Sequence, residues 1–230
     1  MQRHFEDQIE ELKGQLLHMS GQAERIIRKA VESLQRRDPQ LAEEVFRDDK
    51  VIDRLEIEIE ERCIHLLALQ QPLAGDLRLI TSALKISNDL ERVGDHAVNV
   101  AGCAQKLLAL PVVRPLADFG PLVDGASGML REALDAFVRR DADAARRLVL
   151  RDDEVDELNR HLFGELLARM VRDPAEIEAS MAYVLVGRNL ERIGDLATNI
   201  AEEVVFIAEA RVIKHHAEDA AARDEEFGRS

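Results

Sequence analysis

Apolar residues recur at intervals of three and four along nearly the whole chain, and convincing strand alternation is absent. This spacing predicts a first long helix over residues 5–37, a second over 39–71 and a third over 74–110. Asp38 is an N-cap residue directly before a proline, which suits the first helical position. Pro72 ends the second helix because proline cannot donate the next backbone hydrogen bond.

The same rhythm returns after a proline-rich break, where two prolines within five residues indicate a linker. Beyond it the spacing predicts three further helices, over residues 118–140, 141–171 and 173–213. The last residues lose apolar periodicity, which predicts a mobile acidic tail. The chain therefore divides into a first three-helix unit, a linker, a second three-helix unit and a tail: 1–110, 111–117, 118–213 and 214–230.

A twelve-residue segment occurs twice, once in the third predicted helix and once in the sixth. Residues 90–101 read LERVGDHAVNVA and residues 190–201 read LERIGDLATNIA, so eight of the twelve positions are identical. A weaker match joins residues 49–55 of the second helix to residues 152–158 of the fifth. A repeat of this kind indicates that one three-helix unit has been duplicated. The predicted fold class is all-α, with six long helices.

Polar residues of the repeated segment form a stripe along one face of the helix. Glu91, Asp95 and Asn99 are spaced four apart, which places them within about 80° of arc at the border of the buried face. The second half repeats this stripe, and the neighbouring helix of each half adds an acidic pair at the same spacing. The residues concerned are Glu191, Asp195 and Asn199, with the pairs Asp49/Asp53 and Asp152/Asp156.

A solvated acidic face is the simpler explanation for any one of these pairs. Acids occupy 45 of 230 positions, so a single acidic pair at this spacing carries no information. The recurrence of the same three residues in both halves makes a solvated face the less favoured explanation. Gly94 and Gly194 accompany the trio, and a glycine costs a helix interior about 1 kcal/mol relative to alanine. A functional carboxylate cluster, with a neighbouring helix or ligand close to the glycine, is therefore favoured over a solvated face.

Carboxylates near a buried face must be protonated, paired with arginine or bound to cations. Arg92 and Arg192 point about 100° away from their neighbouring acids and cannot neutralise the whole stripe. Bound cations are thus the favoured interpretation, and an all-oxygen site suits Mg²⁺, Mn²⁺ or Ca²⁺ and, with enough ligands, iron. No histidine has an acidic residue three positions before it, so the Glu-x-x-His signature of ferritin-like redox proteins is absent.

Composition narrows the possible partners. Lys and Arg number 31 against 45 Asp and Glu, a formal net charge of −14, which argues against nucleic acid and against direct docking on anionic lipid as partners.

Cys63 and Cys103 are too few for a disulfide framework or a CxxC zinc site. The chain starts without the apolar region of a signal peptide, and its longest run free of charged residues is too short for a membrane span. We therefore expect a cytoplasmic protein.

The doubled LER[VI]GDxAxN[VI]A segment, with the DxxxD pairs before it, resembles the PhoU family of accessory and regulatory proteins of bacterial phosphate-specific transport. The resemblance extends to about residue 213. It implies two tandem, pseudo-symmetric three-helix bundles and usually a homodimer. It also implies multinuclear clusters of iron or zinc, held on the bundle surface by Glu/Asp-x-x-x-Asp motifs.

Carried over by position, the two motifs of the family fall on two sets of four acids, and the motif asparagines fall on Asn99 and Asn199. In the fifth helix Asp153 and Glu157 are an alternative register. The motif residues are Asp49, Asp53, Glu91 and Asp95, followed by Asp152, Asp156, Glu191 and Asp195.

The resemblance also implies a function. It predicts a non-enzymatic negative regulator of phosphate uptake and of the phosphate-starvation response, which links the phosphate ABC transporter to its sensor histidine kinase. Contact with the membrane would be indirect, through these partners. The alternative is a carboxylate-bridged metalloenzyme, either an oxidase or a metal-dependent phosphohydrolase, which would use the same acidic stripes.

Overall fold

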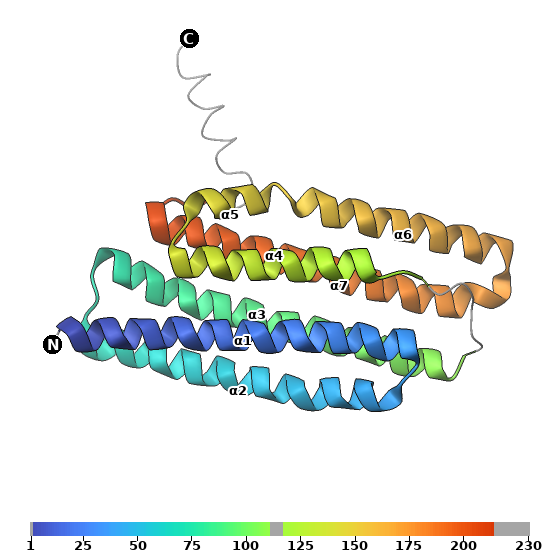
Figure 1. Cartoon of the computed structure of the whole chain (residues 1–230), viewed down its shortest axis with the longest axis horizontal. Coiled ribbons are helices and arrows are strands. Elements are labelled where there is room, and N and C mark those ends of the chain that lie inside the picture. The colour runs from blue at the N-terminus through green and yellow to red at the C-terminus, as the bar shows by residue number, and fades with distance from the viewer. Residues whose placement is uncertain (1, 111–116, 214–230) are drawn as a thin grey trace, which may run out of the picture.

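A computed structural model describes residues 2–110 and 117–213, with side chains from Phe5 onward. These residues form seven α-helices and one short 3₁₀ turn. Within these residues there is no strand. The predicted tail and nearly all of the predicted linker lie outside the described residues. The helices are α1 (Gln2–Arg36), α2 (Pro39–Gln70), α3 (Ala74–Leu108), α4 (Gly120–Arg139), α5 (Ala142–Val149), α6 (Asp152–Arg172), η1 (Pro174–Glu176) and α7 (Ile177–Glu209) (Figure 1).

Local capping residues set the helix boundaries that the sequence predicts. The Asp38 carboxylate accepts a hydrogen bond from the backbone amide of Gln40 at 2.8 Å, directly before Pro39 at the first position of α2. Asp173 accepts one from the amide of Ala175 at 3.0 Å and begins the 3₁₀ turn that leads into α7. In both places the aspartate satisfies a backbone donor that has no partner inside the helix.

The two halves have the same arrangement, and the expected pair of tandem three-helix bundles is confirmed. In the first bundle α1, α2 and α3 pack together, with the apolar stripe of α1 fully buried between the other two helices. In the second bundle α4 takes the place of α1, α5 and α6 together take the place of α2, and α7 takes the place of α3.

The fifth helix differs from its prediction. A single helix over residues 141–171 is wrong, because the chain turns at Leu150–Arg151 and divides into α5 and α6. The amide of Arg151 bonds to the carbonyl of Leu148 at 2.9 Å, and its guanidinium contacts both oxygens of Glu132 at 2.8 and 2.7 Å. Three acidic residues then occupy the first turn of α6, where they favour a new helix N-terminus.

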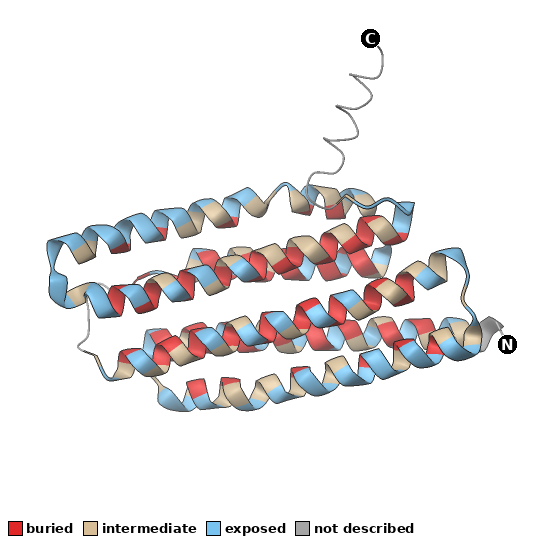
Figure 2. Cartoon of the chain, turned by 180° about the vertical axis from the view of Figure 1, so that it is seen from behind, coloured by how far each residue is buried: buried red, intermediate tan, exposed pale blue. Residues whose placement is uncertain are grey.

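The two bundles meet along α3 and α7, which lie antiparallel in the middle of the molecule. Contacts pair Arg78 with Ile207 and His96 with Asn189, so residue numbers rise along one helix as they fall along the other. Figure 2 shows buried positions along both of these helices, whereas α2 and α6 are largely exposed on the outside. The repeated segment therefore lies on the helices that join the halves. None of the described helices has an apolar stretch long enough to cross a membrane.

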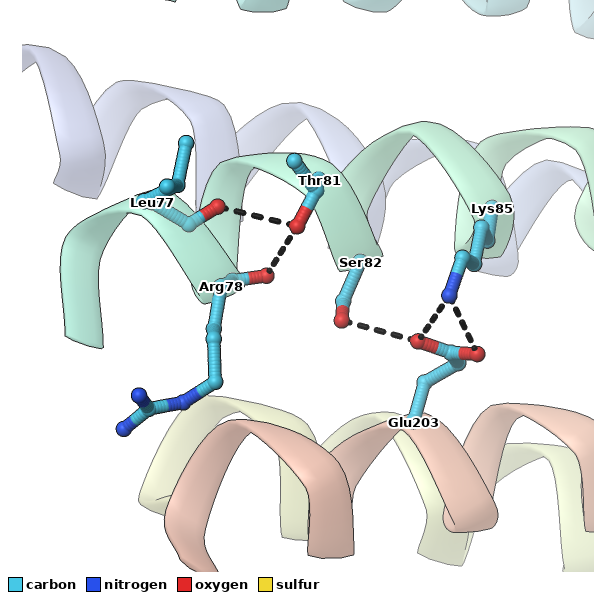
Figure 3. Close-up of polar contacts among 6 residues, drawn as sticks. All are labelled: Leu77, Arg78, Thr81, Ser82, Lys85 and Glu203. Carbon is cyan, nitrogen blue, oxygen red and sulfur yellow. Dashed lines mark hydrogen bonds and ion pairs between the residues drawn. The ribbon is translucent and has the colours of Figure 1, made fainter. Parts of the chain in front are cut away.

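A buried charge crosses this central interface. The Glu203 side chain on α7 is only 2% exposed and reaches α3, where the Ser82 hydroxyl donates a hydrogen bond to it at 2.8 Å (Figure 3). The Lys85 ammonium lies 3.0 and 3.1 Å from the two Glu203 oxygens and 5.5 Å from the centroid of the Phe206 ring. These contacts satisfy a carboxylate that would otherwise be costly to bury.

Replacing Lys85 by leucine would leave the buried carboxylate of Glu203 without its ammonium partner. We expect Lys85→Leu to lower the free energy of unfolding by about 2 kcal/mol. The equivalent positions of the other half hold Leu185 and Cys103, so the duplicated scaffold accommodates apolar residues at both places. The double variant Lys85→Leu/Glu203→Met should therefore recover most of the lost free energy of unfolding. Urea unfolding of the two variants measures this, and an equal loss in both would contradict it.

Candidate metal centre

Four predicted acids of the first half lie together in the outer seam between α2 and α3. Asp49 and Asp53 come from α2, and Glu91 and Asp95 come from α3. Asp49 and Glu91 are partly buried, whereas Asp53 and Asp95 are exposed. The helical spacing of four residues thus places each pair on the face that meets the neighbouring helix.

Burial and crowding of like charges change the proton affinity of this cluster. Burial, with the charges of Asp53 and Asp95, raises the pKa of Asp49 to about 6. Burial, followed by the charges of Asp95 and Glu56, raises the pKa of Glu91 to about 7. Both shifts favour the neutral form, because a carboxylate at this seam is poorly solvated and faces other carboxylates.

Gly94 allows the two helices to approach closely beside this cluster. A Cβ atom on Gly94 would lie 2.6 Å from Asp49 Oδ1 and 3.3 Å from Ile52 Cδ1. The first distance is too short for any real contact, so a side chain here would push the Asp49 carboxylate away. The mid-helix glycine therefore marks the close approach of a neighbouring helix, α2, which carries Asp49 and Asp53.

The second half repeats the cluster between α6 and α7. Burial, with the charges of Asp195 and Asp156, raises the pKa of Asp152 to about 6. Burial, with the same two charges, also raises the pKa of Glu191. Gly194 faces this seam as well, since a Cβ atom on it would lie 3.8 Å from Asp152 Oδ1.

The register of the acidic pair in α6 follows from this geometry. Asp152 and Asp156 are partly buried at the seam beside the acids of α7. Asp153 and Glu157 are exposed, and Glu157 forms an ion pair with Arg160 on its own helix. The alternative register would place both acids on the solvent side.

Sequence reasoning missed one residue in each cluster. Glu56 lies close enough to Glu91 to raise its pKa, so the first cluster contains a fifth acid. The equivalent residue of the second half is Asn159, whose Nδ2 donates a hydrogen bond to Glu191 Oε2 at 2.6 Å. Both residues follow their DxxxD pair by three positions, which is the signal that could have identified them. The first cluster is consequently the more acidic one.

The two motif asparagines lie away from the acidic seams. Asn99 is exposed, one helical turn beyond Asp95. Asn199 lines a different groove, of about 520 Å³, between α3 and α7, together with Lys85 and Arg92. The structure therefore gathers the eight predicted acids into two clusters and sets both asparagines at their margins.

The side chains of each cluster suit a hard cation. Every candidate donor is a carboxylate or amide oxygen, and a cation would offset both the burial and the repulsion that raise the pKa of Asp49 and Glu91. Among the described residues, no three acidic, histidine or cysteine side chains already converge on one point. The exposed carboxylates of Asp53 and Asp95 would therefore have to turn toward the ion.

The pKa shifts predict how the metal-free protein responds to pH. The folded protein holds protons on Asp49, Glu91 and Asp152 more tightly than the unfolded chain does, because folding raises each pKa. Their contribution to stability is therefore complete at low pH and is lost as the pH rises through about 6 to 7. We expect the free energy of unfolding, measured with a chelator present, to fall between pH 5 and about pH 7.5.

Glu91→Gln should reduce this dependence, because glutamine cannot lose the proton. The matched control is Glu58→Gln, which removes the same charge from an exposed position of α2. Chemical unfolding at several pH values compares the two variants with the wild type. An identical pH dependence in all three proteins would contradict the assignment of the shifted carboxyl group to Glu91.

Comparison with known proteins identifies the family of this chain. The family model described as the PhoU domain matches residues 16–104 and 122–204, one copy in each half. The phosphate-specific transport system accessory protein PhoU homologue of Clostridium acetobutylicum is 38% identical over 207 residues, which covers 88% of this chain and 93% of the relative. The homologue of the same description from Aquifex aeolicus is 38% identical over 208 residues, 90% of this chain and 94% of the relative.

Solved structures show the same fold. The crystal structure of PhoU from Pseudomonas aeruginosa superposes with a TM-score of 0.83 at 37% identity, and the match covers 90% of this chain and 100% of that one. The phosphate transport system regulatory protein PhoU from Streptococcus pneumoniae superposes with a TM-score of 0.83 at 26% identity, covering 91% and 99%. With its two domain matches and these full-length relatives, the chain belongs to the PhoU family.

Proposed function

We propose that this protein is a negative regulator of phosphate uptake and of the phosphate-starvation response. It acts in the cytoplasm as a metal-binding, non-enzymatic adaptor between the phosphate ABC transporter and its sensor histidine kinase. Membership of a family whose relatives are named accessory proteins of phosphate-specific transport supports the transporter part of this proposal. The adaptor is a homodimer, as the resemblance of its sequence implies.

The observation that carries the proposal is the pair of acidic clusters at equivalent seams of the two PhoU domains. A solvated acidic face would leave its carboxylates fully hydrated, whereas Asp49 and Asp152 are half-buried beside other acids. A surface seam of this kind lacks the enclosed pocket in which enzymes exclude water from a substrate. It suits the binding of ions on the outside of a rigid scaffold.

Two sets of residues would hold the metal. In the first half these are the four acids of the α2–α3 seam with Glu56, and in the second half the four acids of the α6–α7 seam with Asn159 oriented on Glu191. Bound ions, with iron or zinc as the leading candidates, would supply positive charge to a surface that is otherwise strongly acidic. Asn159 would fix the rotamer of Glu191, as partners of metal ligands commonly do.

Gly94→Ala tests the first site without removing any carboxylate. The new methyl group would lie 2.6 Å from Asp49 Oδ1, so it must displace this carboxylate from the seam. We expect metal affinity of the first cluster to fall by about tenfold. Alanine also favours the helix by up to about 1 kcal/mol, so the fold should persist. Titration with Fe²⁺ or Zn²⁺, followed by calorimetry and metal analysis, measures the change.

Gly194→Ala is the matched control in the second half. Its methyl group would meet Val155 Cγ1 at 3.4 Å and Asp152 Oδ1 at 3.8 Å, which are ordinary contacts. This variant should bind metal as the wild type does. Equal metal binding by the two variants, or negligible metal in the wild type and both variants, would contradict the proposed site.

Deletion of the gene tests the regulatory proposal in the cell. Without the negative regulator, phosphate uptake and expression of starvation genes should rise in phosphate-rich medium, and a plasmid copy should restore control. Uptake of labelled phosphate and a starvation-promoter reporter provide the two readouts. Unchanged phosphate control in the deletion strain would refute the proposal, and catalytic turnover by the metal-loaded protein would favour an enzyme instead.

A further inference from the structure

The outer side of the α6–α7 hairpin exposes large apolar side chains in two parallel rows. Phe163 and Leu167 are spaced four apart on α6, and Met181 and Val184 are spaced three apart on α7. Phe163, Leu167 and Met181 are 46% or 47% exposed, and Val184 is partly exposed. Apolar residues gathered on adjacent helices in this way commonly mark a surface that binds another molecule.

The two rows lie side by side because α6 and α7 are antiparallel in a fixed register. A Cβ atom on Gly187 would lie 2.6 Å from Asn159 Oδ1 and 3.0 Å from Leu162 Cδ2. Gly187 on α7 therefore lies opposite Asn159 and Leu162 on α6. Phe163 and Val184 accordingly line one groove between the helices. One turn further along, the same register pairs Leu167 with Met181.

Arginines continue both rows toward the carboxylate cluster. Arg160 on α6 and Arg188 and Arg192 on α7 line the same groove as Phe163, in a volume of about 380 Å³. Arg160 and Arg192 form ion pairs with Glu157 and Asp195 on their own helices. Because such exposed pairs contribute little, these guanidinium groups can exchange their partners for carboxylates of another protein.

The equivalent surface of the first bundle shares one of these apolar residues and differs at the others. By the internal repeat, Leu167 corresponds to Ile64, which is also exposed, whereas Phe163 corresponds to Glu60 and Met181 to Thr81. Arg160 and Arg188 likewise correspond to Ile57 and Asn88. Since both halves adopt one fold, the fold itself does not require phenylalanine, methionine and arginine at these positions. Protein interfaces are enriched in these three residue types.

The shape and charge of this surface favour one kind of binding partner. Two ridges of side chains on antiparallel helices form a groove that receives the apolar face of a third helix. The arginine end of the groove carries both signs of charge, because Asp156 and Glu191 lie among Arg160, Arg188 and Arg192. A helix can place acidic side chains opposite the arginines and other side chains opposite the carboxylates, whereas a uniformly anionic membrane cannot.

We infer that the outer surface of α6–α7 is the docking site for an amphipathic helix of a partner protein, with acidic residues flanking its apolar face. The surface consists of Phe163, Leu167, Met181 and Val184, with Arg160 and Arg188 at one end. This inference rests on the proposed function, and it assigns the partner helix to the cytoplasmic side of the phosphate transporter. The apolar residues supply the contact area, and the arginines set the direction of the bound helix.

Binding of the full-length protein to the purified phosphate transporter of the same organism, held in neutral lipid nanodiscs, tests the inference. Leu167→Ser/Met181→Ser and Arg160→Glu/Arg188→Glu alter only exposed side chains. Each should weaken binding at least about tenfold, and the second should also abolish its sensitivity to salt. The matched control is Ile64→Ser/Leu77→Ser, which alters two exposed apolar residues of the first bundle and should change binding by less than about twofold.

Three results would overturn the inference. The first is that both α6–α7 variants bind the transporter as the wild type does. The second is that the first-bundle control weakens binding as much as they do. The third is that the wild type binds empty anionic nanodiscs as well as it binds the transporter, and that the α6–α7 variants abolish this lipid binding. A loss of self-association in the α6–α7 variants would overturn it as well, because it would assign this surface to a second copy of the chain.

A second measurement separates this inference from the proposed function. A photo-crosslinking amino acid at position 167, with position 64 as the control, captures the contact in living cells. If the wild-type protein does not bind the transporter, the transporter assignment fails. The docking site then stands only if position 167 crosslinks to an identified helix with apolar and acidic residues. Crosslinks to lipid, to a second copy or to nothing overturn it.

Discussion

Close approach of two helices along each outer seam is the constraint on which both candidate metal sites depend. Gly94 has no side chain, so Asp49 can lie against α3 within a distance that any larger residue would block. A seam of this width removes water from the carboxylates along it, and burial is the first cause of their raised pKa. At the first seam Gly94 therefore determines the packing and the chemistry together, whereas at the second seam the closest approach is at Gly187, against Asn159. Without this approach the acids would be an ordinary hydrated surface, and burial would not raise their pKa.

Local signals allowed most of the fold to be predicted from the sequence. Asp38 and Asp173 cap their helices through contacts with residues only two positions away, so the sequence alone reveals them. The break between α5 and α6 is different, since neither proline nor glycine marks it. At this break the guanidinium of Arg151 contacts Glu132 on α4, a contact that depends on how the two helices pack. The spacing of apolar residues in the sequence does not reveal such a contact between helices.

The candidate site was predictable to the extent that duplication made it visible. Acids that recur in both halves, such as Asp95 and Asp195, stand out from the many other acidic residues. Glu56 and Asn159 are equivalent in position but different in type, so the repeat does not reveal them. Helical spacing also says only which face a residue occupies. Its neighbour across the seam depends on the register of two antiparallel helices, which is why the structure was needed to choose between Asp152 and Asp153.

The internal duplication makes each half a reference for the other. Helix packing constrains both bundles alike, and the acidic pairs and the glycines beside them occur in both seams, although of Gly94 and Gly194 only Gly94 has no room for a methyl group. Differences at equivalent exposed positions, such as Arg160 against Ile57 and Phe163 against Glu60, have no cause in the shared packing. The two outer seams therefore carry similar acidic clusters with different surfaces around them. The proposed adaptor, which joins two unlike partners, requires this combination, because one rigid scaffold must present two faces that are chemically distinct.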